Sequence, residues 1–240
     1  MKKIFIFLIA ISVLMPKKVE AQDKGAAAAA VVGGLLAIGA GIAAVEQMKE
    51  RAELTATEWV LTNQPELTSF SLKTLDFEGK KLKDMSSTSV ILFNIQEFKP
   101  TDKPELNGRK QVLFGFTSYG WINEQGIDFN KVKWKLIDGQ EWLKMMTSYV
   151  KVASGQVNEG HIKDALLAGK IVNKGVKGKG DLDIPFYKLE GDMYVVIDYS
   201  DEMKFIYNER SLGIFLKETS DLVQIGRSEI IKIHDFFFGE

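Results

Sequence analysis

Few residues in this chain have the type and spacing that enzyme chemistry requires. The only histidines, His161 and His234, are far apart in sequence and belong to no metal-ligand pattern such as a histidine pair at helical spacing. Serine catalysis would need a histidine base and a nucleophile turn of the G-x-S-x-G type, and the sequence has no such turn. We therefore predict no catalytic residue, no metal site and no cofactor, and favour a protein that is not an enzyme.

Carboxylates gather at two places in the second half of the chain. Asp198, Asp201 and Glu202 surround one predicted turn, and Asp181 and Asp183 precede a predicted strand. Carboxylate oxygens bind hard cations or form acid-base pairs. Aspartates also stabilise turns by accepting hydrogen bonds from nearby backbone. We interpret both groups as turn residues.

A glycine-rich loop with three lysines is a candidate for contact with an anion. Residues 173–180 read NKGVKGKG, which places Lys174, Lys177 and Lys179 among glycines whose N–H groups are accessible. The loop is not a Walker A motif, because Gly180 stands where Ser or Thr is required. A solvated loop is the simpler interpretation, and contact with an acidic surface or a polysaccharide is the alternative.

An aromatic stretch is the second candidate ligand surface. Residues 114–121 read FGFTSYGW, and Phe116, Tyr119 and Trp121 could stack on sugar rings or on a peptide. We favour a strand packed in the core with a glycine-rich exit, and keep these three aromatics as candidate ligand contacts.

Short apolar runs with period-two alternation predict strands over residues 70–77, 90–98, 111–117 and 132–137. Glycine, proline and asparagine predict loops over residues 99–109 and 118–130. Helical spacing predicts two core-covering helices. The first, over residues 140–153, has Asp138 as N-cap with Glu141 three residues later, and the second, over residues 159–168, has Asn158 as cap.

Residues 182–227 contain apolar segments about ten residues apart, each closed by a turn, which predicts an antiparallel meander. The last segment, residues 229–238, fits a strand or a helix, and we predict a strand. The fold class is therefore α+β: a long N-terminal helix followed by a mixed domain, residues 65–240, with a β-meander and two covering helices.

The N-terminus carries the pattern of an export signal. Lys2 and Lys3 precede an apolar run over residues 4–15, and Val19 and Ala21 are small residues three and one before Gln22. The run is shorter than the roughly 20 residues that span a bilayer. We predict a cleavable signal peptide over residues 1–21. The alternative is an uncleaved hairpin of two segments with the remaining chain in the cytoplasm.

Residues 25–45 contain no charged or polar side chain, and 14 of the 21 are alanine or glycine. We predict one helix over residues 26–63, within a segment of residues 22–64. At helical spacing, one ridge of small residues would permit close helix packing; its members are Gly25, Ala29, Gly33, Ala37 and Gly41. Three interpretations stay open: insertion in or on a membrane, assembly with copies or partners, and a buried or loosely ordered soluble helix.

Composition excludes several classes of protein. The net charge of -1 provides no field to attract nucleic acid, so we predict no nucleic-acid partner. The chain has no cysteine, which excludes disulfides and thiolate chemistry. With 45% hydrophobic residues, the composition is that of a globular domain.

Together these patterns predict an exported cell-envelope protein, in the periplasm, outer membrane or cell surface, with a non-enzymatic binding or scaffolding role. Its expected partners are the membrane, other envelope proteins or copies of itself. The alternatives are a periplasmic or surface enzyme and a pore-forming or membrane-disrupting protein.

Overall fold

A computed structural model describes residues 40–75, 90–117, 122–123, 126–154, 157–168, 195–207 and 211–239. The predicted signal peptide and most of the small-residue ridge, from Gly25 to Ala37, lie outside these residues. Gly41 lies within the first turn of the first described helix.

That helix, α2 (Ala40–Asn63), ends at Asn63 as predicted, before Gln64 and Pro65. One face is buried, and its members recur at helical spacing: Val45, Ala52, Ala56 and Val60. Two of them are alanines, which allows the helix axis to lie close to the sheet beneath. Within the described residues, no helix combines the length and the hydropathy that a membrane span needs.

The first sheet has the order β1-β2-β3-β6, all antiparallel. The predicted strands are confirmed within the described residues as β1 (Phe70–Thr74), β2 (Val90–Glu97), β3 (Lys110–Thr117) and β6 (Val132–Asp138). The region 118–130, which we predicted as a loop, contains a short ladder of β4 (Ile122–Asn123) and β5 (Gly126–Ile127) and a 3-10 helix, η1 (Phe129–Lys131).

Successive side chains along the strands of this sheet point to opposite faces, and each face packs into its own hydrophobic core. On β2, Phe93 faces α2 and Leu92 faces the opposite side. The α2-side core consists of Val45, Ala52, Ala56, Val60, Leu67, Ile91, Phe93, Ile95 and Leu113, with Trp59 and Trp134 packed against it. The central core, on the other face, joins Val90, Leu92, Val112, Phe114, Phe116 and Ile137 to the second half of the chain.

Both predicted covering helices are confirmed, as α4 (Gly139–Ser154) and α5 (Glu159–Ala168). The carboxylate of Asp138 accepts hydrogen bonds from the N–H groups of Gln140 and Glu141, at 2.9 and 2.8 Å, which caps α4. Asn158 caps α5 by accepting from the N–H of His161 at 3.0 Å.

The predicted meander is also confirmed. Its strands are β7 (Val195–Asp198), β8 (Met203–Tyr207), β9 (Ser211–Leu216) and β10 (Asp221–Gly226), in the order β10-β9-β8-β7. Of the predicted segment 182–227, residues 182–194 lie outside the described residues.

The prediction of a strand over residues 229–238 is wrong, because α6 (Arg227–Phe238) occupies this region. Ile230, Ile233 and His234 are buried, and their spacing of three and four residues is helical. The run Phe236–Phe237–Phe238 has high β propensity, but aromatic propensity is weak beside burial of a helical face.

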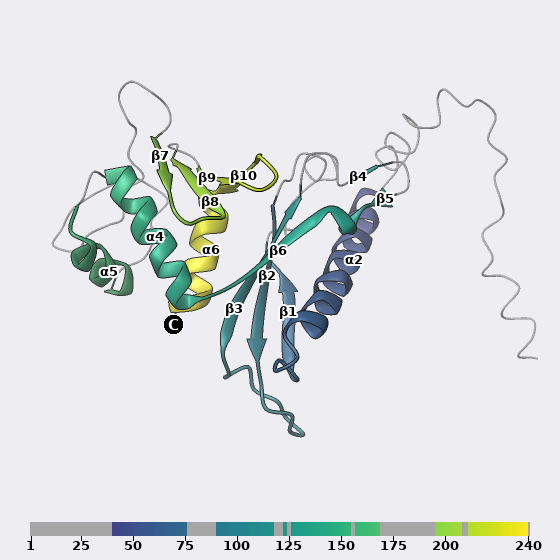
Figure 1. Cartoon of the computed structure of the whole chain (residues 1–240). Coiled ribbons are helices and arrows are strands. Elements are labelled where there is room, and N and C mark those ends of the chain that lie inside the picture. The colour runs from purple at the N-terminus through teal and green to yellow at the C-terminus, as the bar shows by residue number, and fades with distance from the viewer. Residues whose placement is uncertain are drawn as a thin grey trace, which may run out of the picture.

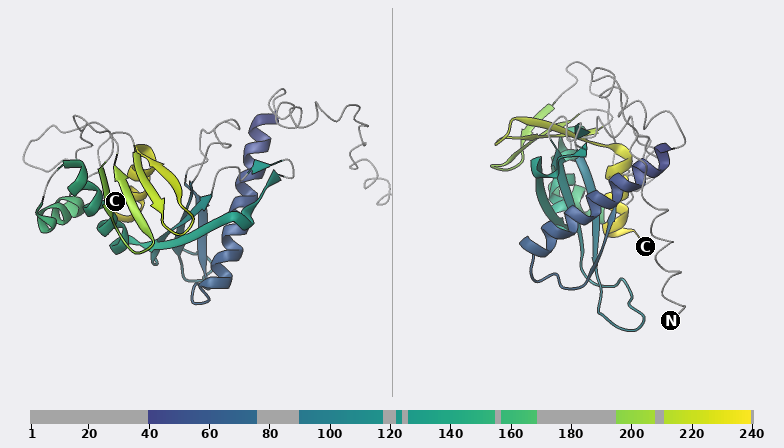
Figure 2. Two further views of the ribbon diagram at one scale, coloured as in Figure 1. Left: turned by 45° about the horizontal axis from the view of Figure 1, so that its top comes forward. Right: turned by 90° about the vertical axis from the view of Figure 1, so that its right-hand side faces the viewer.

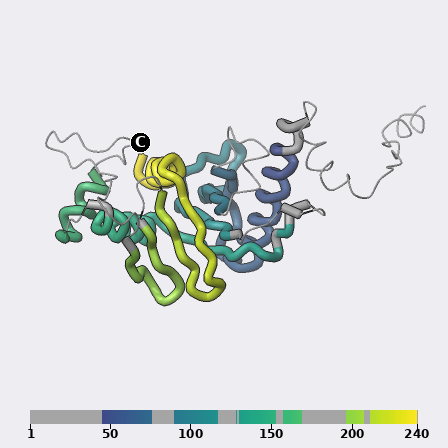
Figure 3. The backbone as a smooth tube through the Cα atoms, turned by 90° about the horizontal axis from the view of Figure 1, so that it is seen from above, coloured from purple at the N-terminus to yellow at the C-terminus, as the bar shows by residue number. Residues whose placement is uncertain are grey.

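The elements form layers around the first sheet, with α2 on one face and α4, α6 and the second sheet on the other (Figures 1 and 2). Seen from above, the N-terminal half lies beside the C-terminal half (Figure 3). The end of α6 packs against the start of α4. A Cβ atom added at Gly139 would lie 3.4 Å from the ring of Phe238.

Candidate functional site

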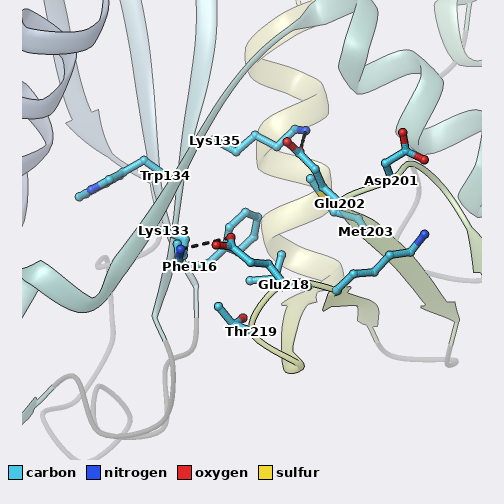
Figure 4. Close-up of a pocket in the computed structure, with 11 residues that line it drawn as sticks. Phe116, Lys133, Trp134, Lys135, Asp201, Glu202, Met203, Glu218 and Thr219 are labelled. Atoms are coloured by element: carbon cyan, nitrogen blue, oxygen red, sulfur yellow. Dashed lines mark hydrogen bonds and ion pairs between the residues drawn. The ribbon is translucent and has the colours of Figure 1, made fainter.

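A cleft of about 550 Å³ lies between strand β6 and the turns of the second sheet. Lys133 and Lys135 of β6 form one side. The β7–β8 turn contributes Asp201 and Glu202 to the other side, and the β9–β10 turn contributes Lys217, Glu218 and Thr219. The cleft therefore opens where the first sheet meets the two hairpins of the meander (Figure 4).

Two ion pairs cross the cleft. Lys133 Nζ lies 3.2 Å from Glu218 Oε2, and Lys135 Nζ lies 3.0 Å from Glu202 Oε2 (Figure 4). The side chains of Glu202 and Glu218 are 75% and 80% exposed. Exposed pairs of this kind contribute about 0–1 kcal/mol, so an incoming charged group can exchange with them at low cost.

Strand alternation explains why two lysines face the cleft. Lys133 and Lys135 are two residues apart and share a face of β6, whereas Trp134 points away from the hairpins (Figure 4). The Trp134 ring packs in the α2-side core, with ring centroids 5.9 Å from those of Trp59 and of Phe93. Trp134 thus fixes the strand, while the two lysines beside it face the cleft.

A third lysine organises the hairpin side. Lys217 Nζ lies 2.8 Å from Asp198 Oδ1 and donates a hydrogen bond of 2.7 Å to the backbone oxygen of Ser200. The hydrogen bond and charge of Lys217 lower the pKa of Asp198 below its usual value. Lys217 therefore ties its own turn to the β7–β8 turn.

The β7–β8 turn has its own internal support. Ser200 Oγ accepts hydrogen bonds from the N–H groups of Glu202 and Met203, both at 3.2 Å. Next to it, the Tyr199 ring stacks on Phe205 with centroids 4.3 Å apart, and its hydroxyl donates to Glu141 of α4 at 2.7 Å. These contacts hold Glu202 opposite Lys135.

Apart from Trp134, the apolar lining of the cleft comes from the central core. Phe116 and Met203 are buried, and Leu216 is partly buried. Charged groups of both signs thus surround an apolar patch. This arrangement suits a ligand with an apolar part and charged groups, such as a peptide side chain or an amphiphile.

Of the candidate ligand residues from the sequence, only Phe116 falls in the described part of the chain. It is 4% exposed in β3, which agrees with the favoured interpretation of a strand packed in the core, and it lines the cleft. Tyr119, Trp121, Lys174, Lys177 and Lys179 lie outside the described residues.

Sequence patterns did not single out the lysines of β6 or the glutamates that they contact. The pattern VKWKLI indicates a strand with two lysines on one face, but a solvent-facing strand gives the same pattern. Residues 133 and 218 are brought together only by the packing of two sheets, which no local pattern encodes.

The carboxylates of the β7–β8 turn are used as ion-pair partners. Asp198 pairs with Lys217 and Glu202 with Lys135. Over the described ranges, no three His, Asp or Glu side chains are grouped in a way that could hold a metal ion. Asp181 and Asp183 lie outside these ranges.

The two histidines have different surroundings. His161 is exposed on α5, whereas His234 is 2% exposed on α6, and its Nδ1 accepts a hydrogen bond of 3.3 Å from Trp142 Nε1. This direction of donation requires a neutral imidazole with its proton on Nε2. The contact joins α6 to α4 inside the central core.

Comparison with known proteins finds no matching family model, no matching curated protein and no matching solved structure.

Proposed function

We propose that this chain is an exported protein of the cell envelope with a non-enzymatic binding or scaffolding role. In this proposal, the N-terminal alanine- and glycine-rich segment attaches to a membrane or to partner helices, and the α+β body presents a binding site. The observation that carries the proposal is the way in which α2 joins the two parts.

The described part of helix α2 runs from Ala40, within the alanine- and glycine-rich segment, to Asn63 in the body. Val45, the last residue of that segment, is already buried in the α2-side core. Further along, Glu53 Oε1 accepts hydrogen bonds from the backbone N–H and the hydroxyl of Thr74 on β1, at 2.9 and 2.7 Å. The described part of α2 is therefore held firmly to the body, and we infer that attachment of the segment orients the body through this helix.

The cleft supports a binding role for the body. Its ion pairs are exposed and exchangeable, and its apolar patch is continuous with the central core. A ligand seated there would touch the first sheet and both hairpins of the second sheet at once.

The bounds of α2 decide which deletion can test this function. Deleting residues 25–45 would remove Val45 from the core, whereas deleting residues 25–39 keeps the described helix Ala40–Asn63. We would fractionate producing cells that carry the full chain or the 25–39 deletion. We would then determine the N-terminus and intact mass of each product.

The proposal predicts that the full chain starts at Gln22 and fractionates with the envelope, while the deletion is exported and soluble. The matched control replaces residues 25–39 by a polar linker of equal length, and it should behave like the deletion. A full chain that keeps residues 1–21 and stays in the cytoplasm would refute export. Equal solubility of all three chains would refute attachment through this segment.

A further inference from the structure

The solvent face of α2 carries a short apolar stripe. Leu54 and Leu61 are 70% and 56% exposed and lie seven residues apart, which is two helical turns. They lie on the side of the helix opposite Ala52 and Ala56, which pack on the first sheet. A single exposed leucine is ordinary, but two at heptad spacing occupy one of the two positions that line the seam between paired helices.

Two charged residues of opposite sign border this stripe. Arg51 and Glu58 are exposed, are also seven residues apart, and alternate with the leucines at steps of three and four. In the described part of the chain, no ion pair engages either of them. Seven residues separate them by about 10 Å along the helix axis, so they do not pair with each other.

We propose that this face binds a second copy of the chain, with the two α2 helices antiparallel. In heptad terms, Arg51 and Glu58 occupy a positions, and Leu54 and Leu61 occupy d positions. An antiparallel pair sets a against d, so Leu54 lies level with Glu58 of the second copy and Leu61 with its Arg51. Arg51 of each copy then lies one layer from Glu58 of the other.

Charge decides the direction of the pair. A parallel pair would oppose Arg51 to Arg51 and Glu58 to Glu58, which is repulsive at both layers. In the antiparallel register, the positions that flank the seam near the two-fold axis are Thr55 and Thr57, which carry no charge. The net charge of -1 per chain adds little repulsion between copies.

The inference does not rest on the proposed function, because it uses the face of α2 around Leu54 and leaves residues 25–39 unchanged. In this register the two helices overlap over residues 49–63, about 22 Å, which makes a small interface. We therefore expect a dimer that dissociates on dilution.

The test is sedimentation velocity of the purified full chain over a wide concentration series. The chain should dimerise, and the variant L54E/L61E should be monomeric with an unchanged far-UV circular dichroism spectrum. Each single charge reversal, R51E or E58R, should raise the dimer dissociation constant by about fivefold or more. The double reversal R51E/E58R should restore the original constant, because every pair is re-formed with exchanged partners.

Three outcomes would overturn the inference. A chain that is monomeric throughout the series excludes the dimer. Dimers that persist in L54E/L61E use another surface, such as the ridge from Gly25 to Gly41. A double reversal that does not recover the original constant excludes the antiparallel pairing.

Discussion

At the scale of single residues, burial and the carboxylate of Glu141 both act on the pKa of Tyr199. Burial, and then the hydrogen bond to Glu141, raise the pKa of Tyr199 well above its ordinary value of 10.0. The phenol therefore keeps its proton in the folded protein at pH values where an unfolded tyrosine loses it. This difference stabilises the fold fully below pH 10, and the stabilisation is lost as the pH rises above that value.

We predict that Tyr199→Phe lowers the free energy of unfolding by about 1–2 kcal/mol at neutral pH. The phenyl ring keeps its stack on Phe205, so the loss reports the hydrogen bond to Glu141. Above pH 10 the wild type should lose stability more steeply than the variant, measured by urea denaturation at each pH. Parallel pH profiles for the two proteins would contradict this account.

The Trp142–His234 contact gives a second prediction at this scale. Trp142→Phe removes the donor to His234 Nδ1 and should lower the free energy of unfolding by about 2 kcal/mol or more. The double variant with His234→Phe removes both polar partners. It should be less destabilised than the sum of the single variants, by about 0.5–3 kcal/mol. Strict additivity in chemical denaturation would mean that the hydrogen bond contributes nothing.

The same scale shows why the candidate site was only partly predictable. The sequence singled out residues by unusual local composition, such as the aromatics near Phe116. The cleft instead uses common lysines and glutamates, whose role depends on separations of 67 residues (Lys135 to Glu202) and 85 residues (Lys133 to Glu218). Such contacts arise from tertiary packing and leave no periodic signal in the chain.

At the scale of elements, helices and strands were predicted correctly where apolar and polar residues alternate clearly or where a capping residue marks a helix start. The strands of the first sheet, the meander and the caps Asp138 and Asn158 all follow from local rules. It failed at α6, because three consecutive phenylalanines obscured the three-and-four spacing of Ile230, Ile233 and His234. Local propensity is a weaker guide there than the burial of one face against the central core.

The close packing of α2 on the first sheet leads to a third prediction. Ala52 and Ala56 are fully buried, so Ala56→Leu adds volume where there is no space and should destabilise the fold by about 1–3 kcal/mol. The matched control, Glu46→Leu, introduces the same side chain at an exposed position of the same helix that lies outside the leucine stripe. That change should lie within about 0.5 kcal/mol of the wild type. Equal effects of the two leucines in thermal denaturation would show that α2 is not packed as described.

At the scale of the whole molecule, both halves of the chain contribute residues to the central core. Leu92 and Phe114 of the first sheet lie in one cluster with Trp142 of α4, Ile214 of β9 and Ile233 of α6. Neither half can bury its share of this cluster alone. The elements from α2 to β6 and those from α4 to α6 should therefore unfold together.

The tryptophans provide a reporter in each core for the last prediction. Trp59 and Trp134 pack in the α2-side core and Trp142 in the central core. Urea unfolding followed in Trp121→Phe/Trp142→Phe, whose remaining tryptophans are Trp59 and Trp134, should have the same midpoint by fluorescence as by far-UV circular dichroism. A chain cut to residues 40–138 would expose the apolar face of the first sheet, so it should bind a hydrophobic dye and lack a cooperative transition. Suppose instead that the fragment unfolded cooperatively, with the dependence of its unfolding free energy on urea concentration that is normal for a folded domain of its size. The two halves would then be independent domains, and the cleft would lie at a domain boundary.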